Sequence, residues 1–119
     1  MNNKVSSEFS NIVFISTWKG IKKIKTEDVI YMKSSDKYSE IYLNNDDKIE
    51  SSSTLSDLAK SFSQDFFYRV NRTTVINLLY AEEFLSSKCC VLLLNNSEIV
   101  VSRRRKQDFL KQWISFYSN

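Results

Sequence analysis

The chain has 119 residues, of which 42% are hydrophobic and 26% are charged, so we expect one domain and too little chain for a second. Lysine and arginine number 17 against 14 acidic residues, and this formal charge of +3 is too small to identify a partner by itself. The absence of histidine excludes a Ser-His-Asp triad and a histidine-bearing metal site. One glycine and no proline exclude a P-loop and a dinucleotide-binding fingerprint. The composition therefore predicts neither an enzyme nor a cofactor.

The cysteines and the chain's apolar runs suggest where the protein works. Cys89 and Cys90 are adjacent and can rarely bridge each other without strain, so we expect no disulfide, with one thiol facing the core and one facing outward from a strand. No apolar run approaches a membrane span, and residues 1–10 lack the apolar centre of a signal peptide. These features predict a cytoplasmic protein with a flexible segment over residues 1–10 and one domain over residues 11–119.

From Ile12 onward, short runs of β-branched and aromatic residues alternate with small polar clusters, which is typical of strands. With almost no glycine or proline, asparagine, aspartate and serine must form the turns. The expected strands cover residues 12–15, 29–32, 38–43, 67–70, 74–78, 90–94 and 99–101, with turns at residues 34–36, 44–47, 86–87 and 95–96. This spacing predicts a mostly β domain of hairpins.

Two segments have helical spacing. Apolar residues at i, i+3, i+4 and i+7 follow Thr54, which predicts a short amphipathic helix over residues 54–63 with Thr54 as its N-cap. A broad apolar face over residues 107–117 predicts a C-terminal helix. The aromatic stripe of this second helix favours a core or dimer contact over a ligand site.

Residues 101–106, VSRRRK, form the most basic run of the chain. If Ser102 caps the C-terminal helix, four cations occupy its first turn, where the helix dipole opposes each of them by a few tenths to about 1 kcal/mol. An external phosphate would relieve this repulsion, and an arginine can also bind guanine in a major groove. A solvated basic face with no partner is the simpler alternative.

Two other polar clusters favour a nucleic-acid partner. Residues 67–77, FYRVNRTTVIN, place Asn71 and Arg72 between two apolar strands, and these residue types suit adenine and guanine edges. Residues 34–39, SSDKYS, place Lys37 beside hydroxyl groups at a hairpin tip. The pattern predicts three loops presented by a rigid scaffold.

These three segments resemble the LytTR family of bacterial DNA-binding domains in order and spacing. Residues 67–77 match the family pattern F-[FY]-R-x-[HN]-R-[ST]-x-x-[VI]-N, residues 101–104 match V-S-R-R, and residues 53–58 match the start of its short helix. The resemblance covers about residues 24–110. It implies an elongated, mostly β domain of short antiparallel sheets with one or two short helices. It also implies a transcription regulator of a two-component system that binds double-stranded DNA through loops in the major groove.

Carried over by position, the resemblance implies DNA contacts in all three loops. These contacts fall on Lys37, Tyr38 and Ser39 in the first loop, Asn71 and Arg72 in the second, and Arg103 and Arg104 in the third. Lys106 is added as a phosphate contact from its place in the basic run. The family usually has histidine where Asn71 stands, so an amide must remake or lose that contact. Asn77 matches a position that we interpret as structural.

The resemblance implies partners besides DNA. Direct repeats in the DNA imply two copies per site, and a homodimer on DNA is one arrangement. Family members commonly carry a receiver domain, for which 119 residues leave no space, so a separate receiver-type or membrane partner is an open alternative. The rival hypothesis is a module that binds a protein or membrane surface through the basic run and the C-terminal aromatics Trp113, Phe116 and Tyr117.

Overall fold

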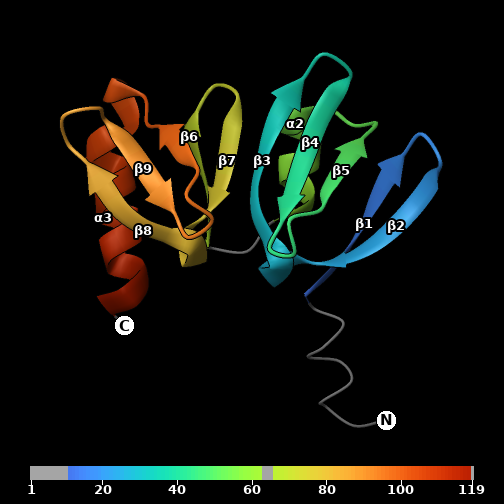
Figure 1. The fold of residues 1–119 in the computed structure, drawn as a ribbon, viewed down its shortest axis with the longest axis horizontal. Helices are drawn as coiled ribbons and strands as arrows, with labels where there is room; N and C mark the ends of the chain where they lie inside the picture. The colour runs from blue at the N-terminus through green and yellow to red at the C-terminus, as the bar shows by residue number, and fades with distance from the viewer. Residues whose placement is uncertain (1–10, 63–65, 119) are drawn as a thin grey trace, which may run out of the picture.

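The structure is a computed structural model that describes residues 11–62 and 66–118 (Figure 1). Within these residues, ten strands form three antiparallel sheets, joined by two α-helices and three short 3-10 turns. The domain measures 47 × 38 × 23 Å, so it is elongated. The predicted mostly β fold of short sheets is confirmed. The flexible segment predicted over residues 1–10 lies outside the described residues.

The first sheet is a hairpin of β1 (Ile12–Thr17) and β2 (Gly20–Lys25). Gly20 has φ +146°, a conformation that side-chain-bearing residues rarely adopt, so the single glycine stands at the turn that needs it. A 3-10 turn, η1 (Thr26–Asp28), leads from the hairpin into the central sheet. The hairpin stays attached to that sheet, because the Ser52 amide donates to the Ser16 carbonyl at 2.9 Å.

The central sheet has five strands in the order β5-β4-β3-β7-β6. Their bounds are β3 (Val29–Ser35), β4 (Tyr38–Leu43), β5 (Lys48–Ser51), β6 (Phe67–Asn71) and β7 (Thr74–Asn77). In the sequence, β5 is followed by the helix α2 (Leu55–Ser61) and then by β6. Thr54 is the N-cap of α2, as predicted, and its side chain accepts a hydrogen bond from the Asp57 amide at 3.2 Å. Residue 63, the last of that predicted helix, lies outside the described residues.

The third sheet and the C-terminal helix lie on the side of the central sheet that is opposite the β1–β2 hairpin. After η2 (Leu78–Tyr80), the strands β8 (Ala81–Leu85), β9 (Cys90–Leu93) and β10 (Glu98–Val100) lead through η3 (Arg103–Arg105) into α3 (Lys106–Ser118). Figure 1 shows this unit on one side of the central sheet and the β1–β2 hairpin on the other.

Alternation along the central strands gives the domain two cores. Val29, Met32 and Ile41 belong to a core shared with α2 and the hairpin. Ile76 and Phe109 belong to a second core shared with β8, β9 and α3. Both cores bury side chains of the same sheet, so the sheet is a rigid platform for the turns at its ends. Asn77 is fully buried, and its side chain donates to the Val29 carbonyl at 2.9 Å, which supports its structural interpretation.

Three strands were not predicted, and one cysteine is not where expected. Lysines interrupt β2, charged residues alternate in β5, and a glutamate pair lies in β8, so each lacks the apolar run on which the prediction depended. One of the two thiols was expected to face the core, and Cys90 is buried. The other was expected to face outward from a strand, but Cys89 lies half-buried in the β8–β9 turn with φ +51°, and its thiol donates to the Val101 carbonyl at 3.3 Å.

Candidate nucleic-acid interface

The three predicted loops lie along one edge of the domain, the upper edge in Figure 1. We call this the loop edge; it consists of the β3–β4 turn (Asp36–Lys37), the β6–β7 turn (Arg72–Thr73) and η3. Backbone hydrogen bonds join the three segments. The Ser34 amide donates to the Thr73 carbonyl at 2.9 Å, and the Ser102 amide donates to the Val70 carbonyl at 2.9 Å. Segments far apart in the sequence thus form one continuous surface.

The first loop presents Lys37 and Tyr38. Lys37 is exposed at the hairpin tip, and its side chain has no hydrogen-bond or ion-pair partner among the described residues. Tyr38 is 47% exposed and has φ +126°, a strained conformation for a residue with a bulky side chain. The ring of Trp18, from the β1–β2 turn, lies against the Tyr38 ring with centroids 5.6 Å apart.

Ser39 does not fit its predicted role as a DNA contact. It is only 1% exposed, and its hydroxyl donates to the Ser53 carbonyl at 2.7 Å. Alternation along β4 explains this, because Ser39 shares the inward face with Ile41 and Leu43. Ser39 therefore connects the first loop to the segment before α2.

In the second loop, Asn71 and Arg72 behave differently although they are neighbours. The Asn71 side chain donates to the Val100 carbonyl at 2.6 Å and accepts from the amide and hydroxyl of Thr73 at 2.8 and 3.0 Å. Asn71 thus ties the β6–β7 turn to the end of β10. The Arg72 side chain is exposed and has no partner among the described residues.

Arg69 and Arg105 support the second and third loops from below. Arg69 donates to the carbonyls of Asn71 and Arg72 and reaches Ser56 Oγ at 3.4 Å. Arg105 donates to the Arg69 carbonyl at 3.3 Å. Both guanidiniums are occupied by neighbouring groups of the protein, so they hold the loop edge in shape.

In the third loop, the helix starts differently from the prediction. The three arginines form η3, and α3 begins only at Lys106, so its first turn holds one of the four cations rather than all of them. Ser102 precedes η3 but its side chain makes no capping hydrogen bond, and its buried Oγ has no partner in the described part of the chain. The helical run is still continuous, so its N-terminal end carries Arg103 and Arg104, both exposed.

Lys106 is less available than Arg103 and Arg104. It is half-buried, and its Nζ lies 5.7 Å from the centroid of the Phe84 ring. Such a cation–π contact stabilises the ammonium where it is, by about 0.5 to 1 kcal/mol at an exposed site. Of the eight predicted contacts, the structure therefore brings five to an accessible surface: Lys37, Tyr38, Arg72, Arg103 and Arg104.

Two carboxylates near the loop edge are paired within the protein, one beside the first loop and one on α3. Beside the first loop, the carboxylate of Glu40 accepts from the Tyr42 hydroxyl at 2.8 Å and lies 3.4 Å from Lys48 Nζ. These partners, Tyr42 first, hold the pKa of Glu40 below its usual range. The Tyr68 hydroxyl donates to Asp108 at 2.7 Å and anchors α3 to β6; burial first and then this bond raise the pKa of Tyr68 to about 12.

The C-terminal aromatics of the rival hypothesis are mostly part of the core. Trp113 stacks on the buried Phe109 with centroids 5.8 Å apart, and Phe116 packs against Phe66 and Tyr117. Among the large hydrophobic residues of α3, Tyr117 is 60% exposed and Ile114 is 62% exposed. The prediction of a core stripe fits this packing better than an exposed docking stripe does.

Over residues 11–62 and 66–118, no helix is long and apolar enough to cross a membrane. The same residues contain no cluster of three or more cysteine, aspartate or glutamate side chains that could hold a metal ion.

The sequence also contains a basic segment that our prediction overlooked. Residues 19–25, KGIKKIK, carry four lysines and no acidic residue, and they form the turn and second strand of the β1–β2 hairpin. Acidic residues such as Glu27 and Asp28 follow this segment, so the net charge of the chain does not reveal it. The local run of lysines is the signal that identifies it.

Comparisons with known proteins agree with this architecture. The family model described as LytTr DNA-binding domain matches residues 19–114. Among solved structures, a LytTr DNA-binding domain of a protein named as a methyl-accepting/DNA response regulator from Bacillus cereus superposes with a TM-score of 0.72. It is 17% identical, and the match covers 86% of this chain and 95% of that chain. No curated protein matches the chain.

Proposed function

The chain belongs to the LytTR family of DNA-binding domains, and from this premise we propose that it reads a specific double-stranded DNA sequence through its loop edge. DNA binding and transcription regulation are general properties of the family. Sequence specificity and entry into the major groove are the parts proposed here for this chain. The observation that carries the proposal is a set of exposed cations, without partners among the described residues, on one edge: Lys37, Arg72, Arg103 and Arg104.

These four cations suit different parts of a duplex. Arginine can donate two parallel hydrogen bonds to guanine, so Arg72 and Arg104 are the proposed base-reading residues. Lys37 enters the groove from the β3–β4 turn together with Tyr38, and Arg103 binds a phosphate near the N-terminal end of the helical run. Asn71 holds the second loop in place against the end of β10, next to the third loop, and is not itself a proposed base contact.

The dimensions of the domain agree with loops that enter more than one groove. Its longest dimension is 47 Å, whereas one turn of B-DNA measures about 34 Å. A domain laid along the duplex therefore covers more than one turn, and its loops can approach successive major grooves. Direct repeats in the operator would then accommodate two copies side by side.

Selection of bound duplexes from a randomised pool at physiological salt tests this function. We expect enrichment of a defined motif, repeated at the spacing of a helical turn. If each of the four loop-edge cations, in the groove or on the backbone, displaces one condensed counterion, the logarithm of affinity should fall against the logarithm of salt concentration with a slope of about −3.6. Retention without enrichment would contradict sequence specificity. No retention, or a slope near zero, would overturn DNA binding through this edge.

A further inference from the structure

The β1–β2 hairpin holds a second group of cations outside the three predicted loops. Lys19, Lys22, Lys23 and Lys25 are all exposed, and none forms an ion pair with a described residue. No acidic residue lies in β1, in β2 or in the turn between them. The hairpin is at one end of the domain and η3, the third part of the loop edge, is near the other (Figure 1), so the hairpin adds basic groups beyond the first loop.

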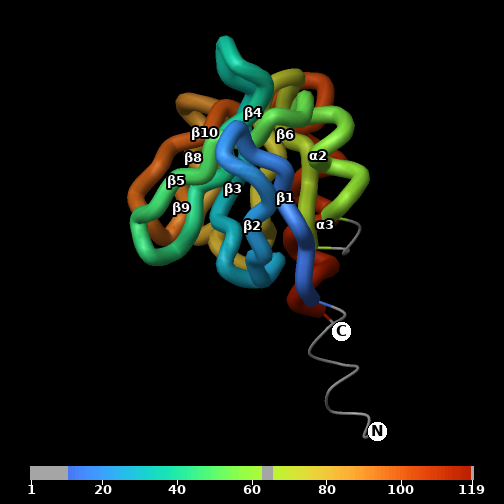
Figure 2. The backbone as a smooth tube through the Cα atoms, turned by 90° about the vertical axis from the view of Figure 1, so that its right-hand side faces the viewer, coloured from blue at the N-terminus to red at the C-terminus, as the bar shows by residue number. Residues whose placement is uncertain are grey.

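The tip of this hairpin touches the first loop. Trp18 is 62% exposed, yet its ring lies against Tyr38, the residue that follows Lys37. Viewed from the hairpin side, the β1–β2 tip lies directly below the projecting β3–β4 turn (Figure 2). The hairpin is fixed in this position through Ser16, which accepts from the Ser52 amide. The loop edge is thus continuous with the hairpin tip.

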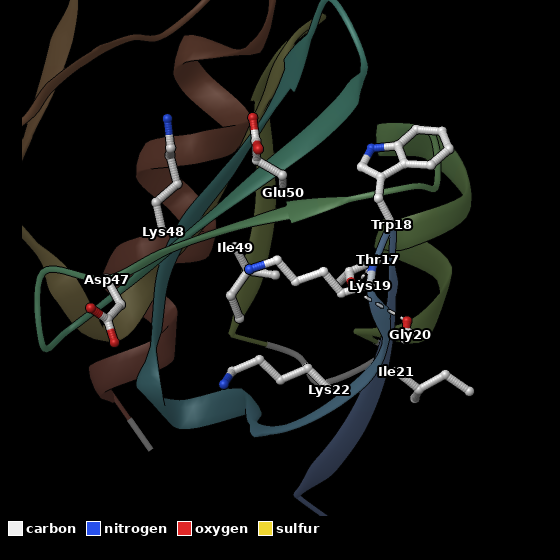
Figure 3. A pocket seen from close by; sticks show the side chains of 10 residues that line it. All are labelled: Thr17, Trp18, Lys19, Gly20, Ile21, Lys22, Asp47, Lys48, Ile49 and Glu50. Carbon is white, nitrogen blue, oxygen red and sulfur yellow. Dashed lines mark hydrogen bonds between the residues drawn. The ribbon is translucent and has the colours of Figure 1, made fainter.

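Lys19 and Lys22 extend from the hairpin over an open groove of about 600 Å³ beside β5 (Figure 3). Trp18 also lines this groove, next to Lys19. The groove also contains Lys48, Asp47 and Glu50, but Lys48 is already paired with Glu40, and neither carboxylate pairs with Lys19 or Lys22. The ammonium groups of Lys19 and Lys22 are therefore available to an anion from outside.

We propose that the tip of the β1–β2 hairpin is a fourth DNA-contacting element, in which Lys19 binds a backbone phosphate flanking the sequence read by the three loops. Trp18 supports this contact by bracing the strained Tyr38 and by fixing the tip beside the first loop. This inference rests on the proposed function, because the duplex must lie along the loop edge to reach Lys19. Phosphate contacts position the protein and carry no sequence information, so the hairpin adds affinity and register but no base preference.

The hairpin offers a matched control for its own test. Lys25 is also exposed and without an ion pair, but it lies five residues beyond Gly20, roughly 17 Å from the tip at about 3.3 Å per residue. Lys19→Ala should weaken binding equally on the selected motif and on random duplexes, and it should make the salt slope shallower by about 0.9. Lys25→Ala should bind like the wild type on both. Both side chains are exposed, so we expect equal thermal stability for the two variants.

Shortening the duplex flank on one side of the motif and then on the other locates the contact. Loss of one flank should weaken the wild type and leave Lys19→Ala unchanged, as expected when both changes remove the same interaction. Equal salt slopes for Lys19→Ala, Lys25→Ala and the wild type, with motif binding intact, would overturn the fourth element and leave the proposed function standing. Failure of the wild type to enrich any motif would instead refute the proposed function.

Discussion

The exposed cations of the loop edge and the polar residues just beneath them come from the same short segments but do different work. Arg72 extends without a partner among the described residues, whereas its neighbour Asn71 makes three hydrogen bonds within the protein. Lys37 is exposed, whereas Ser39, two residues later, is buried and bonded to Ser53. Residues of one motif are therefore divided between exposed cations and side chains that form hydrogen bonds within the protein.

The two sets of residues should differ in how much their substitution changes the free energy of unfolding. Removing an exposed cation should change the free energy of unfolding by less than about 0.5 kcal/mol, because it leaves no unsatisfied group. Removing a bonded polar side chain leaves its partners unsatisfied and costs about 1 to 3 kcal/mol. We therefore expect substitution of an exposed cation to weaken DNA binding without changing stability, and substitution of a hydrogen-bonded polar residue to lower stability.

Asn71→Ala should have the largest effect. It removes the hydrogen bonds to the Val100 carbonyl and the Thr73 amide, so we expect a loss of about 2 kcal/mol of unfolding free energy, at about 1 kcal/mol for each bond. DNA affinity should also fall, because the β6–β7 turn is no longer tied to β10. Urea unfolding and a DNA titration measure the two effects. If unfolding stays unchanged while affinity is lost, Asn71 contacts DNA directly and the comparison fails.

Asn71→Asp refines this result. A carboxylate can still accept from Thr73, but it cannot donate to the Val100 carbonyl. We therefore expect a stability between those of the wild type and Asn71→Ala. A variant as stable as the wild type would show that the bond to β10 contributes nothing.

Arg104→Ala should affect binding but not stability. We expect a loss of about 2 kcal/mol of binding free energy on the selected motif, together with a relaxed base preference. Lys111→Ala is the control, since it removes one exposed cation from α3 at least about 10 Å further along the helix. Affinities are compared on the motif and on random duplexes. Equal losses on both for Arg104→Ala would contradict its role in base reading.

The sequence revealed the loops but not the bonds that hold them. Val29 to Met32 and Tyr38 to Leu43 are apolar enough to be predicted as strands, and turn chemistry located the segments between strands. The role of Asn71 depends on Val100, 29 residues away, and no local spacing encodes that contact. The lysine-rich β2 was missed because its stability comes from pairing with β1 and not from its own apolar pattern.

Ser39→Ala should cost about 1 kcal/mol of unfolding free energy, because the Ser53 carbonyl loses a partner at 2.7 Å. The salt slope of DNA binding should stay as in the wild type, since no cation is removed. Ser34→Ala is the control, because Ser34 is exposed and its side chain makes no hydrogen bond to a described residue. A stable Ser39→Ala variant with weakened DNA binding would return Ser39 to the set of DNA contacts.

Tyr68→Phe should have the smallest effect at neutral pH, about 0.5 to 1 kcal/mol, because it removes only the hydroxyl bond between β6 and α3. Its clearer signature is alkaline. Burial and Asp108 raise the pKa of Tyr68 to about 12, above the value near 10 in the unfolded chain. Its contribution to stability is therefore complete below pH 10 and disappears as pH rises towards 12.

Unfolding measured between pH 9 and 12 tests this contribution, and the Tyr68→Phe curve should fall less steeply than that of the wild type. Some slope should remain, because burial and the bond to Glu40 also raise the pKa of Tyr42. DNA affinity at neutral pH should change little, since η3 is still held through Ser102 and Arg105. Parallel curves for the two proteins would show that the Tyr68–Asp108 bond does not anchor the helix that carries the arginines.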